Sequence, residues 1–186
     1  MKFFNKQEGI GLIVIFTILL AISIPNFALS IKRSRDVTRK EDLGRLVTSI
    51  SGFQAKYKVF PESTSDGKMK ICHDPTQPTD IDKNGDGIID VKFAACEWGE
   101  ESYLGRLPRD PDSSEGVTYF YVSNGKRYQI YEALEATDDA EYNEKVLNRK
   151  IMCGTRVCNA GRAYANTPLD MTLEEYENKL INEKNK

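Results

Sequence analysis

The hydrophobic and polar positions of this chain separate an uncharged N-terminal run from a mixed remainder. Residues 10–31 carry no charge; a short polar leader, residues 1–9, precedes them, and a charged stretch from Lys32 to Asp42 follows. An apolar run of about 20 residues is long enough to cross a bilayer as a helix. No small-residue signal-peptidase site closes the run. We therefore expect residues 10–31 to form a transmembrane helix that continues into the rest of the chain.

Beyond this anchor the apolar positions follow a helical period. They are Val37, Leu43, Leu46, Val47, Ile50, Phe53 and Tyr57. This spacing predicts an amphipathic helix within residues 32–61, with one buried stripe and with Pro61 at its end. A helix from Ile10 to Lys58 would be roughly 73 Å long at 1.5 Å per residue. A domain of this size cannot cover a helix of that length, so half of the helix must lie in lipid or against other copies of the chain. Pro25 is expected to kink or locally unwind it.

The remaining residues predict a small α+β domain. Val117–Val122 and Lys126–Leu134 are rich in aromatic and β-branched residues, and Ser123–Gly125 between them indicates a β-hairpin. Thr172 opens a capping box that begins a C-terminal helix ending near Ile181. We expect the long helix to pack on a small antiparallel sheet in a globular domain of residues 62–135. Residues 136–186 form a C-terminal extension with a disulfide loop and the final helix.

Composition excludes two classes of function. The net charge is −2 over 186 residues and the hydrophobic content is 40%, so nucleic-acid binding has no electrostatic support. The lone histidine is His73, beside a cysteine, and no nucleophile motif or phosphate-binding glycine loop occurs. We expect no enzymatic activity.

An acidic loop spans residues 82–90 and reads D-K-N-G-D-G-I-I-D. This matches positions 1, 3, 5, 6, 8 and 9 of an EF-hand calcium loop. The candidate ligands are the side chains of Asp82, Asn84, Asp86 and Asp90 and the carbonyl of Ile88. Position 12, normally a bidentate Glu, is Phe93.

The missing ligand could come from Asp80, Glu97, Glu100 or water, so we expect a weak calcium site with Kd on the order of 10⁻⁴–10⁻³ M. The alternative is an Asx-rich turn that binds nothing.

The four cysteines indicate the compartment. Cys72 and Cys96 bracket the acidic loop, and Cys153 and Cys158 bracket four residues. Of the three possible pairings we favour the two between nearest neighbours. A zinc site with His73 lacks a second ligand pair. Paired cysteines and a calcium loop favour an oxidising, calcium-rich exterior for the domain. The number of basic residues after the anchor favours a cytoplasmic domain instead. We give more weight to the argument from the cysteines and the calcium loop.

Several segments together resemble the type IV pilins and type II secretion pseudopilins. Gln7–Ile13 resembles their prepilin-peptidase junction, and Ile24–Phe27 resembles their proline region. Arg35–Leu43 resembles their R-D-x-x-R-x-x-D-L stretch. Tyr57–Pro61 resembles the end of their long helix, and Leu104–Pro111 the L-P-x-D-P segment before their sheet.

The resemblance implies cleavage between Gly9 and Ile10, often followed by N-methylation of the new first residue. A cut after Phe3 would put Glu8 fifth and Pro25 in the family's usual register, but would follow a residue other than glycine; we favour the first. The family usually has Glu at the fifth mature position, where this chain has Val14.

Sequence and resemblance together suggest a structural subunit of a pilus-like filament or secretion pseudopilus, held as a single-pass membrane protein before assembly. Its expected partners are prepilin peptidase, further copies of itself, other pilin-like subunits and the assembly machinery. The alternative is a surface-anchored calcium-binding module, an adhesin or sensor, that never polymerises.

Overall fold

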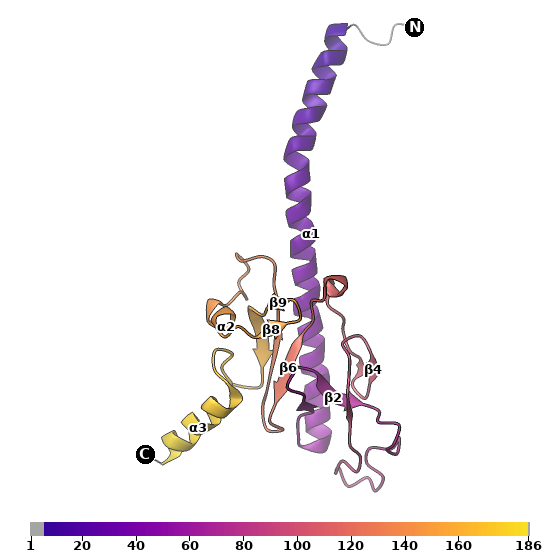
Figure 1. The fold of residues 1–186 in the computed structure, drawn as a ribbon, viewed down its shortest axis with the longest axis vertical. Helices are drawn as coiled ribbons and strands as arrows, with labels where there is room; N and C mark the ends of the chain where they lie inside the picture. Colours follow the sequence, from indigo (N-terminus) through magenta and orange to yellow (C-terminus); the bar gives the residue numbers. More distant parts are fainter. Residues whose placement is uncertain (1–5, 186) are drawn as a thin grey trace.

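The computed structural model describes residues 6–185, and it has an α+β fold built on one long helix. Helix α1, Lys6–Tyr57, has 52 residues, which corresponds to about 78 Å. Figure 1 shows its first half projecting from the folded domain, while the second half runs through it. Residues 1–5 of the expected leader lie outside the described residues.

The second half of α1 buries one continuous stripe. Leu43, Leu46, Ile50, Phe53 and Tyr57 are all buried, as the helical period predicted. Val37 is not part of this stripe, because 49% of its surface is exposed.

The stripe continues toward the N-terminus through two charged residues instead. Asp36 and Arg39 are 1% and 0% exposed. Positions 36, 39, 43, 46, 50, 53 and 57 alternate steps of three and four, which keeps them on one helix face.

Pro25 does not unwind α1. The helix is continuous through position 25, and Figure 1 shows a gentle curve along the projecting half instead of a sharp bend. The helix retains hydrogen bonds on both sides, and the Asn26 side-chain amide donates to the carbonyl of Ile22 (3.1 Å). The end of α1 lies at Tyr57, because Lys58 adopts a left-handed conformation (φ 62°).

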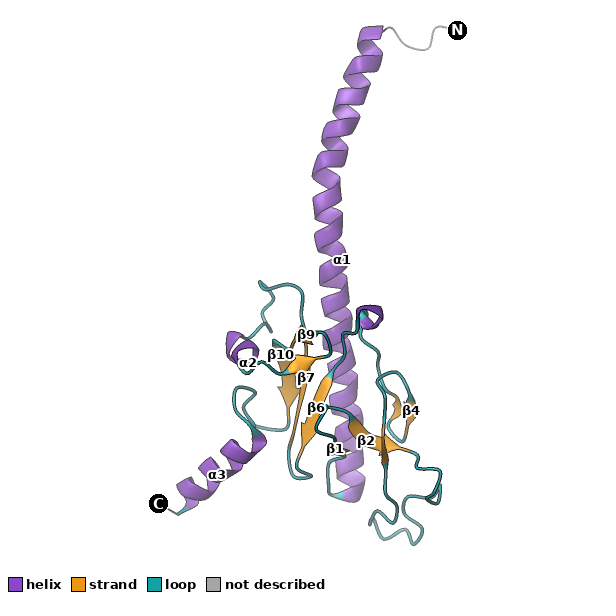
Figure 2. Ribbon diagram, in the orientation of Figure 1, coloured by secondary structure: helices purple, strands orange, loops and turns teal. Residues whose placement is uncertain are grey.

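The strands are short and pair antiparallel (Figure 2). One sheet has the order β1-β2-β3, from Glu62–Ser63, Met69–Cys72 and Ala94–Ala95. A second has the order β10-β7-β6, from Ala160–Ala163, Tyr128–Glu132 and Phe120–Ser123. The two-stranded pairs are β4 (Glu101–Ser102) with β5 (Gly105–Arg106), and β8 (Met152–Cys153) with β9 (Arg156–Val157).

The expected hairpin is present as β6 and β7, with Phe120 opposite Tyr131 and Ser123 opposite Tyr128. Both strands are shorter than predicted; Val117 forms a bridge with Gly154 instead of continuing β6. Strand β10 lies on the other edge of β7. The C-terminal segment therefore supplies a strand to the central sheet, which its sequence pattern did not reveal.

The side chains of α1, β2, β6 and β7 share one core. Leu43, Ile50, Met69, Tyr121 and Ile130 are among its fully buried members. A smaller core lies on the other side of β7, around Val117, Tyr131, Val146, Cys153 and Cys158. The hairpin aromatics are therefore core residues, as their spacing along the strands predicted.

Three short helical segments complete the fold: η1 (Ser113–Glu115), α2 (Glu144–Asn148) and α3 (Leu173–Lys184). Thr172 and Glu175 form the predicted capping box, and α3 ends three residues later than expected. The two disulfides join Cys72 to Cys96 and Cys153 to Cys158, which is the nearest-neighbour pairing.

Candidate functional sites: the anchor helix, its charged junction and the acidic loop

The projecting half of α1 is apolar and uncovered. Its exposed side chains include Ile10 (63%), Val14 (52%) and Phe27 (69%). Within residues 6–185 it belongs to the one helix that is long and apolar enough to cross a membrane by length and composition, with a mean hydropathy of 2.5 over its most apolar window. Gly9 and Ile10, the candidate processing residues, lie in the first turns of this helix.

Three of the basic residues that follow the anchor are paired with acidic residues of the segment after β7. Arg33 contacts Asp138 (2.9 Å), and Lys40 contacts Asp139 (2.6 Å). Arg35 binds Glu135 through both Nε and Nη2 (2.6 and 2.5 Å). The segment that follows β7 therefore lies along α1 just below the apolar run and neutralises its basic flank.

Arg39 is the centre of this junction. Its guanidinium is fully buried and donates five hydrogen bonds to four carboxylates. Two go to Asp110 (2.8 and 3.0 Å), and one each to Asp36 (2.7 Å), Asp112 (2.8 Å) and Glu135 (3.1 Å). All five N–H donors of the side chain are satisfied.

Backbone amides supply further hydrogen bonds to these carboxylates. The Asp36 carboxylate accepts from the amides of Glu135 (2.9 Å) and Ala136 (2.9 Å), and Asp110 accepts from the amide of Asp112 (2.8 Å). Arg156 Nη1 forms an ion pair with Asp112 at 2.9 Å, without hydrogen-bond geometry. The junction thereby joins α1 to the segment before η1, to the end of β7 and to β9. We call these residues (Arg35, Asp36, Arg39, Asp110, Asp112, Glu135 and Arg156) the charged junction.

Titration behaviour follows from this geometry. The hydrogen bond from Arg35 is the main reason that the pKa of Glu135 falls to about 2, and the bond from Arg39 adds to it. Burial alone would lower the pKa of Arg39, but hydrogen bonding and charge from Asp110 outweigh it and raise that pKa. Both shifts favour the ionised forms of Glu135 and Arg39 at neutral pH.

The stretch Arg35–Leu43 resembles a segment of the pilin family, but its sequence does not predict its role in the fold. The signal was present in the sequence, because Asp36 and Arg39 continue the three-four alternation of the buried stripe. A search restricted to apolar residues selects Val37 and misses them. Their partners Asp110, Asp112 and Glu135 lie in loops, where no periodicity marks a residue as buried.

Glu132, at the end of β7, is a further buried carboxyl group with a different environment. It is 0% exposed, and neither carboxylate oxygen has a hydrogen-bond partner among the described residues. Burial is the main reason that its pKa rises to about 8, and the charge of Glu141 adds to this, while Arg162 and Arg39 oppose it. Nothing in the sequence separated this glutamate from the strand residues around it.

The acidic loop folds back on itself. The amide of Asp90 donates to the carbonyl of Ile81 (2.9 Å), and the amide of Lys83 donates to the Asp90 carboxylate (3.0 Å). Asp82 accepts from the amides of Asp86 and Gly87 (both 3.1 Å). The two ends of the loop are thus adjacent, and Asp82 holds its turn.

The candidate ligands do not converge in this structure. Within residues 6–185, no three His, Cys, Asp or Glu side chains are grouped as a metal site requires. Phe93, at position 12, packs against Phe53 and Tyr103 in the core. Of the three acidic residues considered as the missing ligand, Glu97 pairs with Lys68 (2.5 Å) and Glu100 accepts from the Glu97 amide (2.8 Å). Asp80 accepts from the amide of Asp82 within the loop itself (3.2 Å).

Comparison of the chain with models of protein families, with curated proteins and with solved structures found no match. The assignment of function therefore depends on the residues of this chain and their geometry.

Replacing Arg39 tests the charged junction. Arg39→Met leaves four carboxylates facing one another with no central cation, and we expect a loss of about 3–5 kcal/mol in the free energy of unfolding. Urea unfolding of the purified chain in detergent, followed by the fluorescence of the buried Trp98, measures this. The matched control is Arg45→Met on the same helix: the Arg45 side chain is 73% exposed, so its loss should change stability by less than about 0.5 kcal/mol. Equal effects of both substitutions would contradict the assigned role.

Glu132 predicts that stability depends on pH. Its folded pKa of about 8 lies above the ordinary value of 4.5, so the folded state keeps a proton that the unfolded state releases. The contribution of Glu132 to stability is therefore fully present below pH 4.5 and is lost as the pH rises through 8, by on the order of 5 kcal/mol in all. Glu132→Gln should remove most of this slope, whereas the exposed Glu174→Gln should not. Unfolding midpoints of the unmodified chain that stay constant from pH 5 to 8 would show that Glu132 does not titrate in this way.

Proposed function

We propose that this chain is a structural subunit of a pilus-like filament or a secretion pseudopilus. The observation that carries the proposal is the apolar half of α1, which its own domain leaves uncovered. An exposed apolar surface of this size needs lipid or protein to cover it. A bilayer can cover residues 10–31 of an unassembled subunit, and the same residues of neighbouring copies can cover them in a filament.

The charged junction supports the same proposal. A subunit pulled from a membrane into a filament by its helix must move as one body with its domain. The Arg39 hydrogen bonds tie α1 to two separate loops, and the buried stripe beyond Leu43 packs against the sheet. The resemblance of the N-terminal residues to the type IV pilins and pseudopilins supports a processed, membrane-inserted precursor.

One observation favours the alternative of an anchored surface module that does not polymerise. Val14 occupies the position at which the resembled family carries a glutamate that neutralises the N-terminal amine of a neighbour. A buried, unpaired amine is costly, so this filament would have to satisfy it by other means. Electron microscopy of sheared surface material distinguishes the two functions: filaments that contain this chain exclude the alternative.

Processing gives the direct test of the filament proposal. The mature chain should begin at Ile10, as measured by N-terminal sequencing with mass spectrometry. Gly9→Leu should block cleavage and filament formation, because it changes the residue before the cut. Gly11→Leu is the matched control, since neither Gly9 nor Gly11 has an atom within 4 Å of an added Cβ. A purified chain that retains Met1 would overturn the proposal.

Calcium binding by the acidic loop is part of the proposal. Its support is the ligand spacing of residues 82–90, together with a turn in which Asp82 already accepts the amides of Asp86 and Gly87. Carboxylate, amide and carbonyl oxygens suit a hard cation such as Ca²⁺. The disulfide between Cys72 and Cys96 closes the segment that contains the loop. In a filament subunit, the ion and this disulfide would hold the loop in one shape.

A thermal melt with calcium and then with chelator tests the site. With Kd near 10⁻³ M, 10 mM Ca²⁺ should stabilise the folded state by about 1.4 kcal/mol, which raises Tm by roughly 3 °C. Asp86→Asn should reduce the shift, and Asp74→Asn, outside the nine-residue loop, should leave it unchanged. If calcium and chelator give the same Tm, the loop is an Asx-rich turn without an ion.

A further inference from the structure

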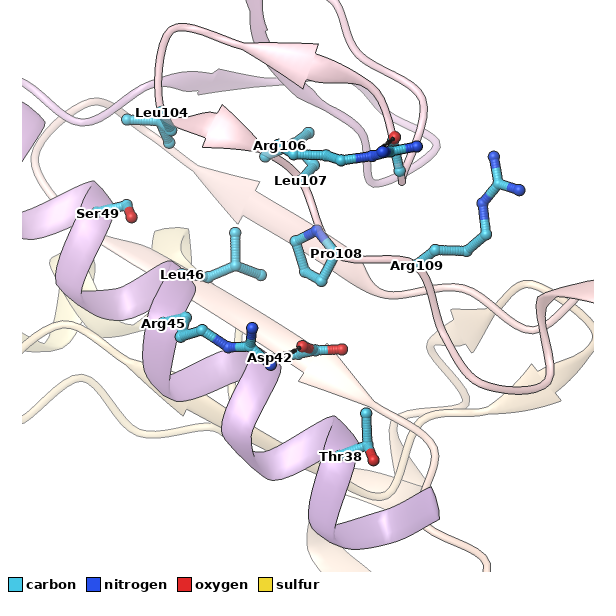
Figure 3. A pocket seen from close by; sticks show the side chains of 11 residues that line it. Thr38, Asp42, Arg45, Leu46, Ser49, Leu104, Arg106, Leu107, Pro108 and Arg109 are labelled. Carbon is cyan, nitrogen blue, oxygen red and sulfur yellow. Dashed lines mark hydrogen bonds and ion pairs between the residues drawn. The ribbon is translucent and has the colours of Figure 1, made fainter. Parts of the chain in front are cut away.

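A groove of about 490 Å³ lies between α1 and the segment that follows β4 (Figure 3). Leu46 of α1 forms one side of its floor, and Leu107 and Pro108 form the other. Leu46 and Leu107 also belong to the main core, so the floor is held rigidly.

Three arginines stand at the rim of this groove: Arg45 on α1, and Arg106 and Arg109 on the opposite wall. All three are exposed. Arg106 donates from Nε to the carbonyl of Gly99 (3.0 Å). The ion pairs of the described residues include neither Arg106 nor Arg109.

Asp42 is the acidic residue among those that line the groove. Its side chain is 8% exposed; it accepts a hydrogen bond from the Tyr119 hydroxyl (2.8 Å) and pairs with Arg45 (3.0 Å). The residues that line the groove therefore carry three exposed guanidinium groups and one largely buried carboxylate, a net positive charge, with the Arg109 side chain extending away from Leu46 (Figure 3).

The acidic loop carries the complementary pattern. Residues 82–90 contain three aspartates and one lysine, a net charge of −2, and Asp74 and Asp80 just before the loop bring the charge of residues 74–90 to −4. Ile88 is 62% exposed and lies between the exposed Asp86 and Asp90. The loop thus offers an apolar side chain flanked by carboxylates, and the groove offers an apolar floor flanked by arginines.

We propose that the arginine groove of one copy binds the acidic loop of a second copy of this chain. Ile88 meets the floor formed by Leu46, Leu107 and Pro108, and the aspartates around it pair with the arginines of the rim. The proposal rests on the filament function, because it assumes copies whose α1 helices run in parallel.

The positions of groove and loop along α1 favour contact between copies over contact within one. The loop lies at the last turn of α1, where an added Cβ on Gly87 would be 3.4 Å from the Lys56 carbonyl. The groove is centred near Arg45, eleven residues earlier, or roughly 17 Å along the helix. Both lie on one side of α1, since Ser49 and Leu104 line the groove and also the cavity beside Ile81. Because groove and loop lie on the same side of α1, a parallel copy that is displaced by about this distance must also be turned about its helix axis for its loop to face the groove.

A calcium ion in the loop is compatible with this contact. A divalent cation would neutralise the net charge of −2 on residues 82–90, and Asp74 and Asp80 would leave residues 74–90 with a charge of −2, opposite in sign to that of the arginine rim. The ion would also fix the conformation of the loop. Because the expected ligand from Ile88 is its backbone carbonyl, its side chain would stay free to face the groove.

Cross-linking between two tagged full-length copies in their native membrane tests the proposal. One copy carries Ile88→Cys and the other Thr38→Cys, at the groove end farthest from its own loop. A short bismaleimide should join them into a heterodimer. The matched control replaces Thr38→Cys with Lys179→Cys, an exposed site on α3, and should give at least tenfold less product.

Charge reversal then identifies the rim. Arg106→Glu with Arg109→Glu should lower the yield of heterodimer at least tenfold, whereas Lys126→Glu with Lys179→Glu should not. Unfolding followed by Trp98 fluorescence shows whether each variant is folded; a folded variant with both arginines reversed and an unchanged yield overturns the proposal.

The outcomes separate this proposal from the filament function. Filaments without the cross-link from Ile88→Cys to Thr38→Cys overturn the groove contact and leave the filament function standing. The cross-link in membranes that produce no filaments supports the groove contact and counts against the filament function.

Discussion

Arg39 is completely buried and binds four carboxylates, so the segments before η1 and after β7 depend on this one side chain for their placement against α1. Taking five charged groups out of water is favourable only if each is paired and hydrogen-bonded. Here each N–H of the guanidinium has an acceptor, and backbone amides satisfy Asp36 and Asp110 from the other side. The apolar stripe that begins at Leu43 supplies the burial, but any apolar helix face could do that. The charges fix which loops meet α1 and at which turn.

The same contacts bear on the orientation of the chain. Counting basic residues after the anchor favours a cytoplasmic domain, whereas the disulfides favour the exterior. In the folded protein, Arg33, Arg35 and Lys40 are paired with Asp138, Glu135 and Asp139. These basic residues therefore have a structural role at the base of the domain, which is a reason for their presence independent of the side on which the domain lies. The number of basic residues is therefore a weaker argument for a cytoplasmic domain, whereas the argument from the two disulfides for an exterior domain is unchanged.

Much of the fold could be predicted because local chemistry determined it. The long helix, the β6–β7 hairpin and the capping box at Thr172 each depend on residues close together in the chain. The features that could not be predicted depend on distant partners. Strand β10 is recognisable only beside β7, Glu132 looks like any strand-end glutamate until its burial is known, and Asp36 and Arg39 look like surface charges until Asp110 and Glu135 are found around them. The acidic loop lies between these cases: its ligand spacing is evident in the sequence, but its carboxylates are not grouped as a metal site in the described residues.

The junction and the uncovered helix together limit how copies can associate. Since α1 is continuous through Pro25 and tied to its domain at Arg39, burial of residues 10–31 among parallel copies in the proposed filament would also determine where their domains meet. Neighbours displaced along the helix present the far end of one domain to the near end of the next. In this chain the far end carries the aspartates around Ile88 and the near end carries Arg45, Arg106 and Arg109. Packing of the apolar helices would supply most of the association energy, and this charged contact would select the displacement at which they pack.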